Sequence, residues 1–401
     1  MNLELLGLLA SFVLIIGLGA RRVPLLFAVL AGSSLLAATS GRPFLANLEV
    51  AAVALTDPTT LELALIVALV TLLARMIKDF GILEPFVASL ATVLGSTRLA
   101  LTVVPAIIGA MPVQGGAIIS APFVGSLGSS LSPERRSAVN LVFRHAWYLV
   151  FPYIPPLLLA SRLAGVPIQH LIIYTLPVTA AILGVAYLTL LGRDGLPVPE
   201  FCHDRVKEIK RLLRLSSPIL VSILLFLVLG IPLPLTLLLG LAIAWHIGQK
   251  PPGTGIEWLM RAPDYRMALT MMAIMIYRHL LAATATLSVA FSALMEAGVP
   301  YMALSVVVPL VVGFSTGDMT AAVGISVAIL VPLMPATSGA LPYVALLYVL
   351  SFSFYFVSPV HMCQVFSNKF FGANHWAVFS QYWPALASGL GIAFIIFFLV
   401  G

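Results

Sequence analysis

The chain has 401 residues, of which 61% are hydrophobic and only 9% are Asp, Glu, Lys or Arg. A soluble domain carries about 25% charged residues, so this composition excludes a water-soluble enzyme and predicts a multi-pass protein of the plasma membrane. The formal net charge of +6 needs no nucleic-acid partner, because the topology derived below places most basic residues on one side of the bilayer. The two cysteines, Cys202 and Cys363, fit neither a disulfide framework nor a metal cluster.

The apolar segments predict an all-α fold with about ten transmembrane helices, since a spanning helix needs roughly 20 apolar residues. In chain order these segments are 3–20, 24–40, 60–77, 134–160 and 168–191, and then 215–231, 233–248, 267–285, 341–365 and 376–400. The stretches 81–95 and 286–298 suit helices that lie in the membrane interface, or further packed crossings.

Two further regions, 98–128 and 301–335, hold pairs of shorter apolar pieces around a polar turn. A piece of roughly 13–16 residues forms a helix of about 20–24 Å, which is too short for a hydrocarbon core of about 30 Å. We therefore interpret each pair as a re-entrant hairpin, which enters the membrane, turns and leaves on the same side. Irregular backbone at that depth must be buried in protein or line a wet cavity.

The second half of the chain repeats the helix-breaking residues of the first. Val103-Val104-Pro105 reappears as Val307-Val308-Pro309, and the pattern Tyr-x-Val-x-Pro of 148–152 reappears at 355–359. Duplicated halves with matching interruptions are typical of secondary transporters, whose site lies where the broken helices meet. The sequence thus divides into a first repeat, 1–191, a linker, 192–214, and a second repeat, 215–401.

The basic residues predict the orientation of these repeats. With the linker 192–214 in the cytoplasm and the crossings alternating, the cytoplasmic side receives every Lys and Arg except Arg42, Arg144, Arg162 and Arg278, as the positive-inside rule requires. Five crossings per repeat, an odd number, invert the second repeat relative to the first. Both termini are then outside, and the two hairpins enter from opposite faces.

The polar turns of the two hairpins are candidate binding sites. Asp318 is a carboxylate deep in the membrane, which is costly there and therefore a functional candidate. With the hydroxyls of Ser315 and Thr320 it could bind sodium or carry a proton, and the same carboxylate suits a helix N-cap. The facing turn contains Gln114, Gly115 and Gly116. Its small residues let backbone amides approach an anion at the start of the next helix.

A fixed cation stands between these turns. Arg144 lies 11 residues beyond Pro133 (144 − 133), roughly 16 Å along a helix, and Tyr148 follows on the same face. The prolines of 151–156 must break this helix. Arg144, Tyr148, Ser315 and Thr316 could thus bind a carboxylate, with His361 and Gln364 on the second broken helix as a cavity wall. The alternative is that Arg144 only pairs with Asp318 to stabilise the fold.

The hairpins carry a resemblance to known carriers. Pro112-Val113-Gln114-Gly115-Gly116-Ala117, with Ser120-Ala121-Pro122 downstream, resembles the first hairpin of gluconate-type permeases of the ion-transporter superfamily. Over its full length the chain resembles the uncharacterised domain-of-unknown-function 401 family. The resemblance implies a scaffold domain, a transport domain formed by 98–165 and 301–372 that moves as an elevator, and a homodimer through the scaffold helices.

Together these features predict a proton- or sodium-coupled secondary transporter for a small organic anion, a carboxylate or sugar acid. The alternative is a sodium/proton antiporter in which Asp318 exchanges the two ions. An intramembrane hydrolase using Ser358 and His361 is the enzyme alternative. It is disfavoured because no zinc-protease motif, nucleophile elbow or Walker lysine loop occurs. No cofactor is expected, and sodium is the one metal ion considered.

Overall fold

The computed structural model describes residues 3–21, 23–110, 116–192, 205–251, 253–283, 298–334 and 339–400, and all regular elements in these ranges are helices. The helices of the first half are α1 (Leu3–Ala20), α2 (Leu25–Thr39), α3 (Phe44–Thr56), α4 (Pro58–Asp79), α5 (Leu83–Leu94), α6 (Thr97–Ala110), α7 (Gly116–Leu127), α8 (Pro133–His145), η1 (Ala146–Leu149), α9 (Pro155–Ala164), α10 (Ile168–Ala186) and η2 (Tyr187–Leu191). Those of the second half are α11 (Arg205–Leu229), α12 (Leu233–Ile247), α13 (Ile256–Arg261), α14 (Tyr265–Ala282), α16 (Tyr301–Thr316), α17 (Met319–Leu330), η3 (Val331–Leu333), α18 (Ala340–Phe356), α19 (Met362–Phe371) and α20 (His375–Val400).

The duplication seen in the sequence recurs in the helix boundaries. Helix α16 begins 204 residues after α6 (301 − 97), while α19 and α20 begin 207 residues after α9 and α10 (362 − 155 and 375 − 168). The offset between the two halves thus changes from 204 to 207 between the hairpins and the broken helices. The repeated proline and glycine residues show the same change. The pair of short helices, the broken helix and the final long helix therefore follow one another in the same order in both halves.

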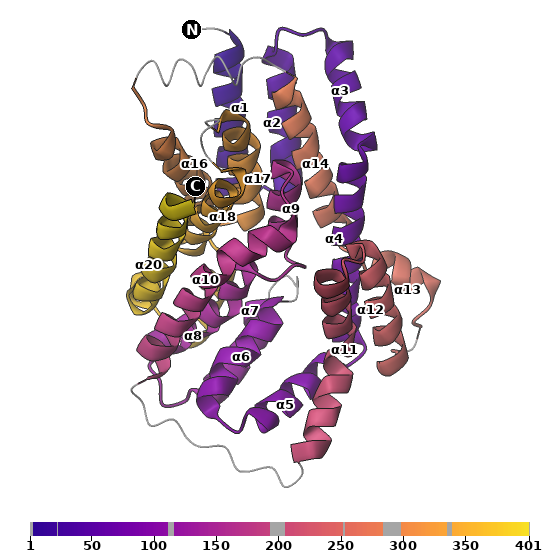
Figure 1. The fold of residues 1–401 in the computed structure, drawn as a ribbon, viewed down its shortest axis with the longest axis vertical. Helices are drawn as coiled ribbons and strands as arrows, with labels where there is room; N and C mark the ends of the chain where they lie inside the picture. Colours follow the sequence, from indigo (N-terminus) through magenta and orange to yellow (C-terminus); the bar gives the residue numbers. More distant parts are fainter. Residues whose placement is uncertain are drawn as a thin grey trace.

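Several elements differ from the sequence expectation, among them the short helix α13, which was not predicted. Helix α3, Phe44–Thr56, was not predicted; it is followed directly by α4, whose N-cap Asp57 accepts from the Thr60 amide at 3.2 Å, and the two form a long rod in Figure 1. The predicted linker 192–214 is shorter than expected, because its basic part belongs to α11, which begins at Arg205 and runs without interruption into the expected crossing. Residues 193–204 lie outside the described ranges.

Four helices among the described residues are long and apolar enough to cross a membrane: Pro58–Asp79, Ile168–Leu191, Arg205–Leu229 and His375–Val400. Most of the other predicted crossings are shorter apolar helices of 10–17 residues. Large apolar side chains face outward, as with Phe44 (80% exposed), Val228 (72%) and Leu399 (79%). Such a surface suits lipid and not water, so the chain is a multi-pass membrane protein. Helix α5 has only 12 residues, about 18 Å, and is too short for a crossing.

Each of the two pairs of short helices packs against a helix from the other half of the chain. Helix α6 packs on α7, and α16 on α17; α7 also packs against α19 of the second half, and α17 against α9 of the first. In Figure 1 the two pairs approach the centre of the molecule from opposite ends. Two further contacts join equivalent helices to each other, α4 to α14 and α10 to α20. The halves are therefore interlocked, and the broken helices lie where they meet.

Candidate functional site

The first broken helix is interrupted where its prolines predict. Helix α8 ends at His145, η1 follows, and α9 begins only at Pro155. Side chains of neighbouring helices bind the carbonyl groups freed by the break: the Thr175 hydroxyl donates to Leu149 O at 2.6 Å, and the Tyr348 hydroxyl donates to Tyr148 O at 2.6 Å. Because buried backbone groups need partners, these two bonds stabilise an irregular segment inside the protein.

The second broken helix is held by the turn between α16 and α17. The Ser358 hydroxyl donates to Phe314 O at 2.6 Å, and Gly317 packs its backbone against Val360 and His361. A Cβ atom built on Gly317 would lie 2.7 Å from the backbone nitrogen of His361. This contact joins the two groups of predicted site residues, those of the second hairpin and those of the broken helices.

Replacing Gly317 by alanine should therefore destabilise the protein for two reasons. Its φ of +59° costs a residue with a side chain about 1–2 kcal/mol, and the added methyl group must displace His361. Gly372→Ala is the matched control, because Gly372 has a φ of +69° but open space around it. Thermal unfolding in detergent should show the larger loss for Gly317→Ala. An equal decrease of the unfolding temperature in both variants would mean that the close contact with His361 does not contribute to stability.

Arg144 is the central residue of the site. Its side chain is 1% exposed, and neither Nε nor Nη1 has a hydrogen-bond partner. Among the described residues no carboxylate forms an ion pair with it, so the predicted structural pair with Asp318 is absent from this conformation. The Tyr148 hydroxyl is the polar group beside the guanidinium. A buried charge without a counter-charge is costly, and an anion bound here would relieve that cost.

Aromatic and imidazole side chains cluster near Arg144. The His145 ring lies 4.9 Å from that of His361 and 5.0 Å from that of Tyr148, and Tyr355 lies 4.6 Å from His361, centroid to centroid. His145 and Tyr355 were not among the predicted site residues. The signals were present, however: His145 adjoins Arg144 at the end of α8, and Tyr355 is the repeat of Tyr148.

A buried polar seam runs along the contact between α8 and α19. The Ser137 hydroxyl bonds Ser367 Oγ at 2.9 Å and Asn368 Oδ1 at 2.7 Å, and Asn140 Nδ2 donates to Ser367 Oγ at 3.1 Å. Gln364, a predicted site residue, is 1% exposed and donates to the Tyr382 hydroxyl at 3.2 Å, while its Oε1 has no partner. The polar residues at 137, 140 and 144 share one face of α8, a spacing visible in the sequence.

Asp318 lies apart from Arg144, in a cavity of about 540 Å³ between the second hairpin, the α1–α2 connection and the start of α14. It caps α17 by accepting from the Ala321 amide at 2.9 Å, as predicted. Thr316, Thr320 and Arg266 line the same cavity, whereas Ser315 does not. The lining of the cavity thus includes one carboxylate, threonine hydroxyls and one guanidinium.

The first hairpin can be compared only in part. Gln114 and Gly115 lie outside the described residues, and Gly116 begins α7. Gly109, near the end of α6, touches the Arg144 backbone so closely that any Cβ atom there would clash with it. The first hairpin is therefore packed directly against the residue at the centre of the site.

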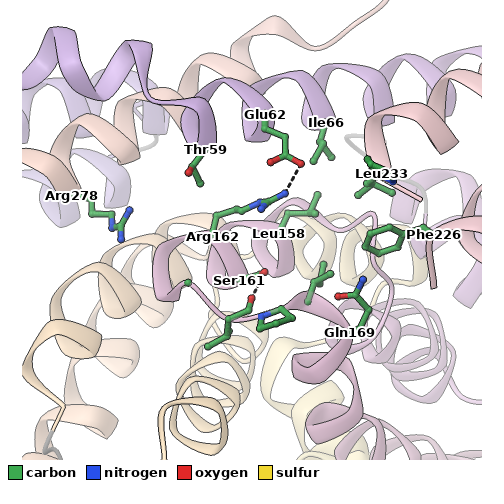
Figure 2. A pocket seen from close by; sticks show the side chains of 15 residues that line it. Thr59, Glu62, Ile66, Leu158, Ser161, Arg162, Gln169, Phe226, Leu233 and Arg278 are labelled. Atoms are coloured by element: carbon green, nitrogen blue, oxygen red, sulfur yellow. Dashed lines mark hydrogen bonds and ion pairs between the residues drawn. The ribbon is translucent and has the colours of Figure 1, made fainter. Parts of the chain in front are cut away.

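A second cavity, of about 610 Å³, lies between α4, α9 and the α11–α12 connection. Figure 2 shows the Arg162 side chain reaching across it from α9 to Glu62 on α4, where Nη2 and Oε1 are 2.6 Å apart. Arg278, Thr59 and Gln169 also line it. This cavity was not predicted from the sequence.

A family model described as "Protein of unknown function (DUF401)" matches residues 4–400. The chain belongs to the DUF401 family. No protein with a curated function matches it. The full-length resemblance stated from the sequence is confirmed for this DUF401 chain, while membership of the ion-transporter superfamily remains a prediction.

Proposed function

We propose that this DUF401 protein is a secondary active transporter for a small organic anion, coupled to protons or sodium. It is built as two inverted repeats whose transport domain moves as an elevator, as in the ion-transporter superfamily. The observation that carries the proposal is Arg144, buried and unpaired where two broken helices and two short hairpins meet. A transporter must bind its anion at such a place, inside the membrane and between interlocked halves.

The chemistry of the site favours a carboxylate. The Arg144 Nε and Nη1 atoms have no hydrogen-bond partner, so both can donate charge-assisted hydrogen bonds to the oxygens of an anion. Tyr148 supplies a hydroxyl beside it. The rings of His145, His361 and Tyr355 pack against one another nearby.

The two cavities support the movement. They use equivalent parts of the scaffold: Pro24 and Leu25 in one correspond to Pro232 and Leu233 in the other, an offset of 208 (232 − 24). The facing parts are not equivalent. The cavity that contains Asp318 is lined by Met362, at the start of α19. The cavity that contains Glu62 is lined by Arg162, near the end of α9, and not by Pro155, which is the residue equivalent to Met362. The transport domain is thus displaced along the scaffold towards Pro24, which the predicted topology places in the cytoplasm.

The size of this displacement follows from helix geometry. Arg162 lies seven residues beyond Pro155 (162 − 155), which is about 10 Å along a helix. We propose that the described conformation faces inward, and that a movement of about 10 Å brings Pro155 to Pro232 in the outward-facing state. Asp318 would then leave its cavity, together with the ion that it binds.

The Glu62–Arg162 pair would act as a latch for the described conformation, since it joins α4 of the scaffold to α9 of the transport domain. Its side chains are 37% and 34% exposed, so the pair is worth at most about 1 kcal/mol. Glu62→Gln should therefore slow labelling of a Thr316→Cys reporter by an impermeant thiol reagent, by at most about fivefold. Asp79→Asn, which breaks the exposed Arg75–Asp79 pair within α4, should leave the rate unchanged. Faster labelling in Glu62→Gln would contradict the latch.

The function itself is tested with purified protein in liposomes. Uptake of labelled gluconate and simple carboxylates should require a proton or sodium gradient, and the transported anion should raise the unfolding temperature in detergent. Sodium-driven proton movement without any anion would instead establish the antiporter. Ser358 gives the hydrolase little support, because its hydroxyl donates to Phe314 O at 2.6 Å.

A further inference from the structure

Beside Arg144 the structure gathers three side chains that commonly bind metal ions. His145, His361 and Cys363 each direct one ligand atom into a common space, and these atoms all lie within 4.8 Å of one another. They come from both broken helices: His145 ends α8, while His361 and Cys363 begin α19. The cysteine is free. Sequence spacing alone could not suggest this group, because His145 and Cys363 are 218 residues apart (363 − 145).

The hydrogen bonds of His145 leave one nitrogen ready for a ligand. Its Nδ1 lies 2.8 Å from Leu141 O, and since a carbonyl oxygen only accepts, Nδ1 carries the proton. The lone pair is then on Nε2, which is buried and has no partner; the whole residue is 0% exposed. Metal-binding histidines commonly show this arrangement, with one nitrogen fixed by a carbonyl group and the other on the metal.

The spacing fits a site that closes slightly on binding. Zinc-type ions bind imidazole nitrogen at about 2.0–2.1 Å and thiolate sulfur at about 2.3 Å, so tetrahedral ligands lie roughly 3.3–3.6 Å apart. The observed limit of 4.8 Å therefore requires movements of about 1 Å. His361 is the N-cap of α19 and Cys363 lies in its first turn, so rotation of the two side chains can supply much of this movement.

We propose that His145, His361 and Cys363 bind one transition-metal ion of the class that prefers imidazole and thiolate ligands, Zn²⁺ or Cu⁺. Cys363 loses its proton on binding and coordinates through Sγ, so each ion bound releases one proton. With Cu⁺ the site is electrically neutral and tolerates Arg144. With Zn²⁺ it carries one positive charge beside the guanidinium, and a carboxylate as fourth ligand would balance both.

This inference does not rest on the proposed transport, because binding is measured without a gradient. Purified protein is titrated anaerobically with Co²⁺, a spectroscopic substitute for Zn²⁺, and separately with Cu⁺ held by a competing chelator. We expect one ion per chain. For Co²⁺ we expect the visible bands of a tetrahedral site and a near-ultraviolet thiolate charge-transfer band, both removed by excess Zn²⁺.

The variants identify the ligands. Cys363→Ser should abolish the charge-transfer band, and His361→Gln should weaken binding at least tenfold. Cys202→Ser removes the other thiol, and His279→Gln removes a histidine whose Nδ1 also bonds a carbonyl, Met275 O at 2.8 Å; neither should change the titration. Should a variant fail to fold, wild-type protein still decides, since bound metal should protect Cys363 but not Cys202 from alkylation. Absence of binding by both ions, or binding that survives Cys363→Ser, would overturn the proposal.

Discussion

Arg144→Ala is expected to abolish carboxylate transport. Removing one partner of a buried, hydrogen-bonded ion pair costs about 3–5 kcal/mol, and each 1.4 kcal/mol is a factor of about ten. The affinity for the anion should thus fall by more than about a hundredfold, measured as uptake in liposomes and as loss of anion-dependent thermal stabilisation. Arg144→Lys should recover little, because an ammonium group cannot donate two parallel bonds to a carboxylate.

The stability of the empty protein separates this role from a structural one. Arg144 has no counter-charge among the described residues, so Arg144→Met should leave the unfolding temperature unchanged or raise it. A marked decrease would mean that the guanidinium holds the fold together. Arg75→Ala is the matched control for loss of an arginine: its side chain is 56% exposed and paired with Asp79, and transport should be unaffected.

Asp318→Asn should uncouple the transporter while sparing the fold. Asparagine caps a helix about as well as aspartate, so the bond to the Ala321 amide can persist, but the neutral side chain can neither carry a proton nor hold sodium by charge. We expect anion accumulation against a gradient to fall at least tenfold, to simple equilibration, whereas the thermal shift with the anion persists. Counterflow and gradient-driven uptake, measured side by side, give the comparison.

Two further substitutions complete this test. Asp318→Ala also removes the cap and should cost about 1 kcal/mol of stability in addition. Asp57→Asn is the control for loss of a capping carboxylate: Asp57 caps α4 by accepting from the Thr60 amide at 3.2 Å. This change should leave coupling intact. If Asp318→Asn accumulates the anion normally, the coupling ion binds elsewhere. If it loses sodium-driven proton movement without any anion, the protein is an antiporter.

Local signals in the sequence predicted much of the fold. Proline and glycine act on their own backbone, so the breaks at 151–156 and 358–361 could be placed from sequence alone. The start of α8 was equally clear: Ser132 accepts from the Arg135 amide at 3.3 Å, and Pro133 takes the first helical position. Helix α3 was missed because its 13 residues are short for a crossing, although Pro43 and Asp57-Pro58 mark both of its ends.

The site was less predictable because it depends on contacts between distant segments. Arg144 and Asp318 stood out by charge alone, since each is expensive in a membrane. The side chains that lie near Arg144 include residues far along the chain, such as His361 and Tyr355. Ser137 and Ser367 are hydrogen-bonded although 230 residues separate them (367 − 137). Only the packing of α8 on α19 brings such pairs together.

The exchange of hairpins between the halves has an evolutionary consequence. Helix α7 packs against α19, and α17 packs against α9. A polypeptide with only one half would therefore lack the helix against which its own hairpin packs. An ancestor of half the length would have needed a second copy of itself to supply that helix.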